Sequence, residues 1–344
     1  MSDPRGYHAR LTARRATALA AAAGAVALAA VLDIGTGPAF LSPATVARAI
    51  GGQAPNEAVD AIVWSIRMPV AAMAICVGAA LGLSGAVMQT LLNNPLASCY
   101  TLGISAAAGF GAALAIVFGT LLPLSADVAI PVHAFAFAAL ACGLVILLGR
   151  CRGMSAEGMV LAGIALLFLF QALLSLLQFI ASPEGLQQIV FWLFGSLMRA
   201  TWGRAALVAG VTLAVMPMLL HDAWRLTALR LGDERARSLG VDVVALRLRC
   251  FAAISLLTGA AVAFVGTIGF AGLVAPHVAR MIVGEDQRFL LPMSAALGAA
   301  LLSSASVASK TIVPGAVFPI GIVTAMIGVP FLVWLVAFGR GRHW

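Results

Sequence analysis

Long apolar stretches separated by short polar segments limit the fold of this chain more than any other feature. About ten of them approach or exceed the roughly 20 residues that a helix needs to cross the hydrocarbon core of a bilayer. Because 62% of the 344 residues are hydrophobic, we expect an integral membrane protein. The stretches lie at about residues 16–32, 68–91, 100–119, 129–149, 157–181, 204–220, 250–267, 269–283, 290–308 and 317–338.

These stretches predict an all-α polytopic membrane protein, with one transmembrane domain over residues 1–344 built as a ten-helix bundle. The alternating pattern of an outer-membrane barrel is absent from the sequence. The stretches 204–220 and 269–283 are short for a span, so we expect them to be tilted or buried among neighbours. A cleaved signal peptide is the alternative for residues 16–32, but their apolar run has full bilayer length, which favours an uncleaved first span.

The placement of the basic residues predicts the orientation. The net charge of +8 would suit a nucleic-acid partner, but the arginines cluster in alternate loops, as the positive-inside rule requires. We therefore expect no nucleic acid, and we place both termini in the cytoplasm. All but five of the 21 lysines and arginines then lie on the cytoplasmic side. The five on the other side are Arg48, Arg67, Arg199, Arg204 and Lys310.

The chain lacks the residues that would power transport on its own. Ion-coupled carriers usually hold ionisable groups within their spans, but we assign the 13 acids to loops, including Asp33 to the first outer loop. A P-loop requires a lysine, and no such motif surrounds Lys310, the only lysine. The five cysteines form no C-x-x-C pair, so we expect reduced thiols and neither a metal nor a cofactor in this chain. Energy for uphill transport would have to come from a partner.

Glycines predict where helices pack closely and where one ends. Gly78, Gly82 and Gly85 recur at a spacing that lets helix backbones approach each other. The sequence GTIGFAG at 266–272, followed by Pro276, predicts a break between two spans that must be shielded by protein. Tight packing alone is the alternative for this run.

The densest group of charges is RLGDERARSLGVD at residues 230–242. We expect a short helix with Asp233 as its N-cap and Gly240 in the left-handed position after its end. Ala236 and Leu239 would share one side and leave the charged residues on the other. A solvated loop would explain the arginines but not a capped helix with interleaved acids and bases. The segment therefore predicts a polar helix offered to a cytoplasmic partner such as an ATPase.

The sequence resembles the permeases of type II ABC importers for iron-siderophores, haem and cobalamin, the FecCD-like family. The stretches that carry this resemblance are IRMP (66–69), GAALGLSGAVMQTLLNNPLA (78–97), TLGIS (101–105), GDERARSLGVD (232–242), GTIGFAGLVAPHVAR (266–280) and FPIGIVTAMIGVPF (318–331). The resemblance implies a non-enzymatic subunit that forms a homodimer around a central pathway in the bacterial inner membrane. Two ABC ATPase subunits would carry ATP and Mg on the cytoplasmic side, and a periplasmic binding protein would dock on the other side.

The resemblance also implies roles for individual residues. Residues 232–241 would couple to the ATPase through Gly232, Asp233, Glu234, Arg235, Ala236, Arg237, Ser238, Leu239 and Gly240. The cytoplasmic gates would be Asn94 with Leu96, and Ser155 with Ala156. The binding protein would dock at Arg67 and Lys310. The chain departs from the family pattern at Val70, where relatives often carry arginine, and at Val317, where many carry glutamate.

The fifth predicted span carries one polar stripe, Gln171, Ser175 and Gln178, which share a helical face. Such a stripe usually faces a cavity or another helix, and hydrogen bonds between helices are the alternative to a pathway lining. The family places its fifth span along the pathway, which favours the lining. We expect an iron chelate, either a siderophore or haem, as cargo. Cobalamin, an ATPase-independent channel or facilitator, and a scaffold without transport are the alternatives.

Overall fold

The computed structural model describes residues 4–119, 125–151, 153–313 and 315–338, which form helices joined by loops without a strand among them. In chain order the elements are α1 (Pro4–Gly35), α2 (Pro43–Ile50), α3 (Glu57–Ala61), the π-helical segment η1 (Ile62–Arg67), α4 (Met68–Leu91), α5 (Ile104–Phe118), α6 (Ala126–Arg150), α7 (Ala156–Ile180), α8 (Pro183–Leu193), α9 (Trp202–His221), α10 (Ala223–Leu229), α11 (Asp233–Ser238), α12 (Val243–Val265), α13 (Ala271–Val283), α14 (Gln287–Thr311) and α15 (Ile320–Phe338).

The predicted all-α multi-pass architecture is confirmed, and each of the ten apolar stretches lies largely on a helix. Seven helical segments of the described chain are long and apolar enough to cross a membrane, and three further apolar helices are shorter, so the count of ten spans stays a prediction. They are Arg10–Gly35, Glu57–Leu91, Ala126–Arg150, Ala156–Ile180, Trp202–His221, Val243–Val265 and Gln287–Thr311. The shorter apolar helices are α5, α13 and residues Ile320–Leu335 of α15. The expectation of a short span at 204–220 was wrong, because α9 begins at Trp202 under the Thr201 cap and has 20 residues.

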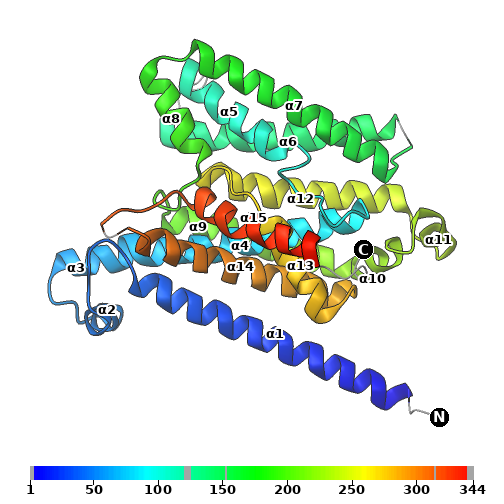
Figure 1. Cartoon of the computed structure of the whole chain (residues 1–344), viewed down its shortest axis with the longest axis horizontal. Coiled ribbons are helices and arrows are strands. Elements are labelled where there is room, and N and C mark those ends of the chain that lie inside the picture. Colours follow the sequence, from blue (N-terminus) through cyan, green and yellow to red (C-terminus); the bar gives the residue numbers. More distant parts are fainter. Residues whose placement is uncertain (1–3, 120–124, 152, 314, 339–344) are drawn as a thin grey trace.

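The helices form two layers (Figure 1). In one layer α5, α6 and α7 pack together with α8 at one end, and in the other α4 lies among α9, α12, α13 and α14. Contacts between α12 and α6 join the layers, and α1 packs on α14 at the outer side of the second layer. Helix α4 is therefore the centre of the fold, which explains why most of its side chains are buried.

Glycines bring α4 against two neighbouring helices, as the sequence predicts. A Cβ atom built at Gly78 would lie 2.3 Å from the Gly298 carbonyl oxygen on α14. The equivalent atom at Gly85 would lie 1.7 Å from the carbonyl oxygen of Gly272 on α13. No other residue type fits these crossings unless the helices separate.

The predicted break in the GTIGFAG run is also confirmed. Residues 266–270 are irregular, with φ angles of +77° at Gly266 and +64° at Phe270. The backbone after α8 covers this break, because the Ser196 amide donates to the Val265 carbonyl over 2.7 Å. The amide of Ile320, at the start of α15, donates to the Gly195 carbonyl over 3.1 Å. Backbone from the loop after α8 and from the start of α15 thus lies against the break and shields it, as a membrane environment demands.

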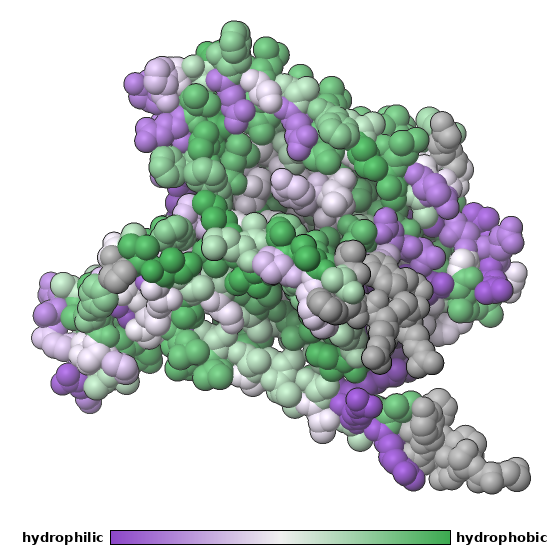
Figure 2. All heavy atoms as spheres, in the orientation of Figure 1, coloured by the Kyte–Doolittle hydropathy of each residue, from purple (hydrophilic) through white to green (hydrophobic). Residues whose placement is uncertain are grey.

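Polar surface gathers at the two ends of the long axis (Figure 2). Helix α11 and the start of α1 lie at one end, and α2, α3 and α8 lie at the other (Figure 1). Helix α15 also ends on the α11 side, which agrees with two termini on one side of a membrane. Which side is cytoplasmic stays a prediction, and the chain after residue 338 lies outside the described residues.

Candidate functional site

The charged segment 230–242 does form a short helix, α11, at one end of the molecule (Figure 1). The predicted cap was wrong by one residue, because Gly232 is the N-cap, with φ of +98°, and Asp233 is the first helical residue. Asp233 does not cap the helix because its carboxylate is bound elsewhere. Gly240 takes the left-handed conformation that the sequence predicts, with φ of +83°.

The side chains of α11 divide into one buried contact and an exposed polar surface. Ala236 is fully buried, whereas Glu234, Arg235, Arg237 and Ser238 are exposed. The expectation that Leu239 shares the buried side with Ala236 was wrong, since Leu239 is 51% exposed. An exposed leucine beside two arginines gives this end of the molecule an apolar contact point within a basic surface.

The Asp233 carboxylate pairs with Arg247, a residue that sequence reasoning missed as a functional candidate. Arg247 Nη1 lies 2.7 Å from Asp233 Oδ2, and Arg247 Nη2 lies 2.9 Å from Asp233 Oδ1. We expected α12 to start near residue 250, but it starts at Val243 and carries Arg247 into the protein interior. An arginine one turn into an apolar helix was the available signal, because such a charge needs buried partners.

The first two predicted gate residues lie in the turn after α4. The Leu96 amide donates to Asn94 Oδ1 over 2.9 Å, which fixes the turn, and the Leu96 side chain is 47% exposed. In the second pair, Ser155 caps α7, because its hydroxyl accepts a hydrogen bond from the Gly158 amide over 3.2 Å.

The structure brings the two gate segments, residues 94–96 and 155–156, to one open hollow of about 430 Å³. Asn94 and Ala156 both line it, whereas Leu96 and Ser155 do not. The hollow lies between the turn after α4 and the first turns of α7. The pairing of the two segments is thus a feature of the fold, while their role as gates stays a prediction.

A second arginine ties the α11 end of the molecule to the turn after α4. Arg230 donates to Asn93 Oδ1 over 2.7 Å and to Glu285 Oε1 over 2.9 Å. Glu285 also pairs with Arg280, whose Nη1 donates to the Gln89 side-chain oxygen over 2.9 Å. These bonds join α4, the segment before α11 and the turn between α13 and α14 in one polar network.

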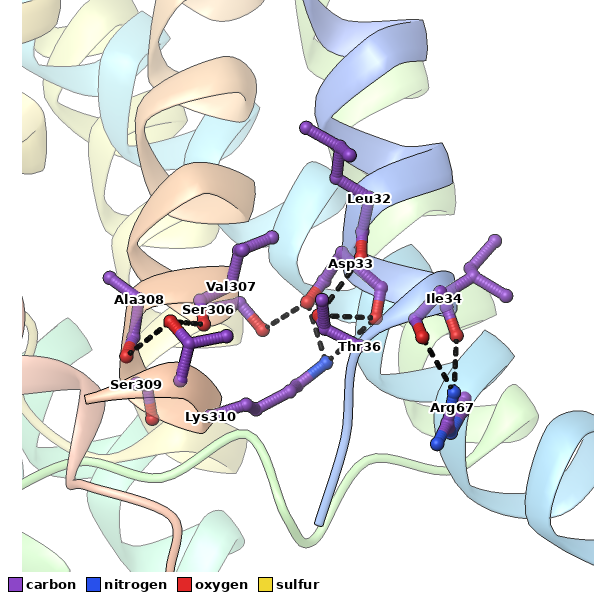
Figure 3. Close-up of polar contacts among 12 residues, drawn as sticks. Leu32, Asp33, Ile34, Thr36, Arg67, Ser306, Val307, Ala308, Ser309 and Lys310 are labelled. Carbon is purple, nitrogen blue, oxygen red and sulfur yellow. Dashed lines mark hydrogen bonds and ion pairs between the residues drawn. The ribbon is translucent and has the colours of Figure 1, made fainter. Parts of the chain in front are cut away.

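The two cations expected to dock a binding protein are buried at the opposite end (Figure 3). Arg67 is 4% exposed, and its Nη1 donates to the Ile34 and Gly35 carbonyl oxygens, each over 3.0 Å. Lys310 pairs with Asp33 over 2.6 Å. Neither cation is displayed on the surface, so burial gives the docking role no support, and that role stays a prediction.

The expectation that all acidic residues lie in loops was wrong for Asp33. It lies in the last turns of α1 and is fully buried. Its Oδ1 atom accepts hydrogen bonds from Lys310 Nζ and, over 2.7 Å, from the Ser306 hydroxyl of α14 (Figure 3). The acid can occupy a helix here because a buried cation and a hydroxyl compensate its charge.

The polar side chains of the α7 stripe lie on the outer surface of the subunit. Gln171 and Ser175 are exposed and Gln178 is half-buried. Within the part of the chain that the structure describes, none of these side chains bonds to another helix. Hydrogen bonding between helices of one subunit therefore does not explain the stripe. A second subunit or an aqueous pathway would.

Comparison with known proteins gives three concordant findings. The profile of the FecCD transport family matches residues 25–338. The hemin transport system permease protein of Yersinia pestis is 38% identical over 290 residues, which cover 84% of this chain and 87% of the relative. The vitamin B12 import system permease protein of Vibrio vulnificus is 38% identical over 280 residues, which cover 81% of this chain and 83% of the relative.

A solved structure described as an inward-facing conformation of a "metal-chelate type ABC transporter" shares the fold. The TM-score is 0.82 at 32% sequence identity, and the match covers 93% of this chain and 98% of that chain. In this chain, the described residues hold no group of three or more His, Cys, Asp or Glu side chains that would bind a metal ion.

Proposed function

Because the chain belongs to the FecCD transport family of ABC transporter permeases, we propose that it is the membrane subunit of an importer for an iron chelate, either a siderophore or haem. In this proposal two copies of the chain surround the pathway in a bacterial inner membrane. Two ABC ATPase subunits bind ATP and Mg on the α11 side. A periplasmic binding protein delivers the cargo to the opposite side.

One observation carries the proposal: the exposed polar helix α11 and the paired segments 94–96 and 155–156 share one end of the molecule. A site where an ATPase grips α11 would therefore lie beside the segments that open or close the path. The chain has no P-loop lysine of its own, so hydrolysis takes place on the partner.

The choice of cargo rests on the relatives and on the exposed face of α7. Relatives are named for hemin and for vitamin B12, and the similar solved structure for a metal chelate, so bulky metal complexes are the shared class. A stripe of two amides and one hydroxyl would bind such a ligand weakly, which passage requires. High affinity then belongs to the binding protein.

Reconstitution tests the proposal. The chain is placed in proteoliposomes with its ATPase and binding protein, and uptake of ferric siderophore, haem and cobalamin is measured with and without ATP. We expect ATP-dependent uptake of one iron chelate. Flux through the chain alone without ATP would refute the importer, and uptake of cobalamin alone would refute the cargo.

A further inference from the structure

Arg247 is only 1% exposed and lies near the start of α12, at the α11 end of the molecule, where it contacts α11, the end of α4 and the turn before α7. We propose that Arg247 transmits the movement of α11 to both gate segments, so that one side chain couples the ATPase contact to the path. This inference rests on the proposed function, since it needs an ATPase that moves α11. It adds a positioning residue that acts through Asp233 and through two backbone carbonyls.

On the α11 side, the contact is a bidentate ion pair. The two Nη atoms of Arg247 meet the two carboxylate oxygens of Asp233 at 2.7 and 2.9 Å. A planar guanidinium that faces a carboxylate through two parallel hydrogen bonds fixes orientation as well as distance. Asp233 is the first residue of α11, so a shift of this helix must move the guanidinium or break the pair.

The same two Arg247 nitrogens also donate hydrogen bonds to backbone carbonyls that adjoin the gate segments 94–96 and 155–156. Nη2 donates to the carbonyl of Leu91, the last residue of α4, over 3.3 Å, and the 94–96 turn follows directly. Nη1 donates to the carbonyl of Met154 over 2.5 Å, and Met154 directly precedes Ser155. The Leu91 carbonyl has no partner within its own helix, because it belongs to the last turn of α4.

An unusual backbone conformation at Met154 places its carbonyl oxygen against Arg247. Met154 is 2% exposed and has a φ of +58°, a conformation that residues other than glycine rarely adopt. Its neighbour Gly153 also has a positive φ, so the chain turns sharply before α7 begins. The turn directs the Met154 carbonyl at Arg247, and water cannot replace the guanidinium at a buried site.

Geometry explains why this position needs arginine. A guanidinium presents several donors in one plane and can hold a carboxylate and two carbonyls together, whereas a lysine ammonium is a point charge on a flexible stem. Arg230, just before α11, adds a second tie to the same turn through its bond to Asn93. Residues that flank α11 on both sides thus contact the last residue of α4 or the turn that follows it.

The test uses the assembled transporter in proteoliposomes and three variants of the permease. Arg247→Lys keeps the charge but loses the planar set of donors, and Asp233→Asn removes the pair from the α11 side. Arg249→Lys is the matched control, because Arg249 lies on the same helix and pairs with Asp222 over 3.1 Å without touching either gate segment. Each variant is assayed for ATPase co-purification, ATP hydrolysis and uptake.

A fourth measurement follows the gate itself. Leu96→Cys is introduced with Cys151→Ser, which removes the exposed native thiol, and the maleimide labelling rate is compared with and without ATP. In the parent protein ATP should change this rate. In Arg247→Lys the ATP-induced change should disappear, although the ATPase still binds and hydrolyses ATP. In Asp233→Asn the ATP-induced change should disappear as well.

We expect uptake to fall on the order of tenfold in both variants, the effect of losing a charge-assisted hydrogen bond. In Arg247→Lys, hydrolysis should stay near that of the parent. Uptake equal to that of Arg249→Lys would overturn the inference, as would an unchanged ATP effect on labelling. A parallel loss of hydrolysis and uptake in Arg247→Lys would also overturn it, because that pattern marks a merely structural residue. If the unmodified transporter fails to bind an ATPase, the proposed function itself falls.

Discussion

Replacing Gly78 by alanine tests the packing at the centre of the fold. The new Cβ atom would lie 2.3 Å from the Gly298 carbonyl oxygen of α14, about 1 Å closer than an ordinary contact. Because the new methyl group meets a backbone atom of α14, no side-chain rotation can relieve the contact. Helices α4 and α14 must therefore move apart. Overpacking of this kind costs about 3 kcal/mol of the free energy of unfolding.

Gly143→Ala is the matched control, because a Cβ atom there meets nothing within 4 Å on the exposed face of α6. Both substitutions gain the same helix propensity, up to ~1 kcal/mol for glycine to alanine, so their difference isolates the packing cost. Unfolding in mixed detergent micelles, followed by circular dichroism, should place Gly78→Ala about 3 kcal/mol below Gly143→Ala. Equal stability of the two variants would refute the close approach of α4 and α14.

Two further predictions concern buried and surface ion pairs. Asp33→Asn should lower the free energy of unfolding by about 3–5 kcal/mol, because it leaves the Lys310 ammonium buried without its counter-charge. The double variant Asp33→Asn with Lys310→Met should restore much of this loss. If the losses of the two single variants simply added in the double variant, the prediction would be contradicted. The hydrogen bond from Arg288, with a smaller contribution from Arg15, holds the pKa of Asp286 below its usual range. The stability from this carboxylate is present above its ordinary pKa and is lost as pH falls through the lowered value. The protection factors of the α1 amides, taken relative to the intrinsic exchange rate at each pH, should therefore fall between about pH 5 and about pH 2. The fall in protection should be smaller in Asp286→Asn, and an equal fall would contradict the prediction.

The helices could be predicted because their apolar lengths carry the information locally. A membrane helix must satisfy its backbone within itself and be apolar along its whole length, so each span can be read without knowledge of its neighbours. The left-handed Gly240 and the break at Gly266 could be found in the same way, since glycine marks both conformations in the sequence.

The errors concern contacts between residues distant in the sequence. Asp33 was assigned to a loop because its partner Lys310, 277 residues away, was not visible as a partner. Arg247 was read as an orientation signal because the Met154 and Leu91 carbonyls that hold it lie 93 and 156 residues away. Leu239 was placed inward from spacing alone, although α11 is too short for spacing to define a face.

The central claim is that α11 is the contact through which a nucleotide-hydrolysing partner works on this chain. Its most direct test is a photo-activatable cross-linker at Arg237, which is exposed on α11, in the assembled transporter. The account predicts that this position cross-links to the ATPase subunit in both copies of the permease, and that the same probe at Arg48 on α2, at the opposite end, does not. Cross-linking to the ATPase from Arg48, with none from Arg237, would contradict it.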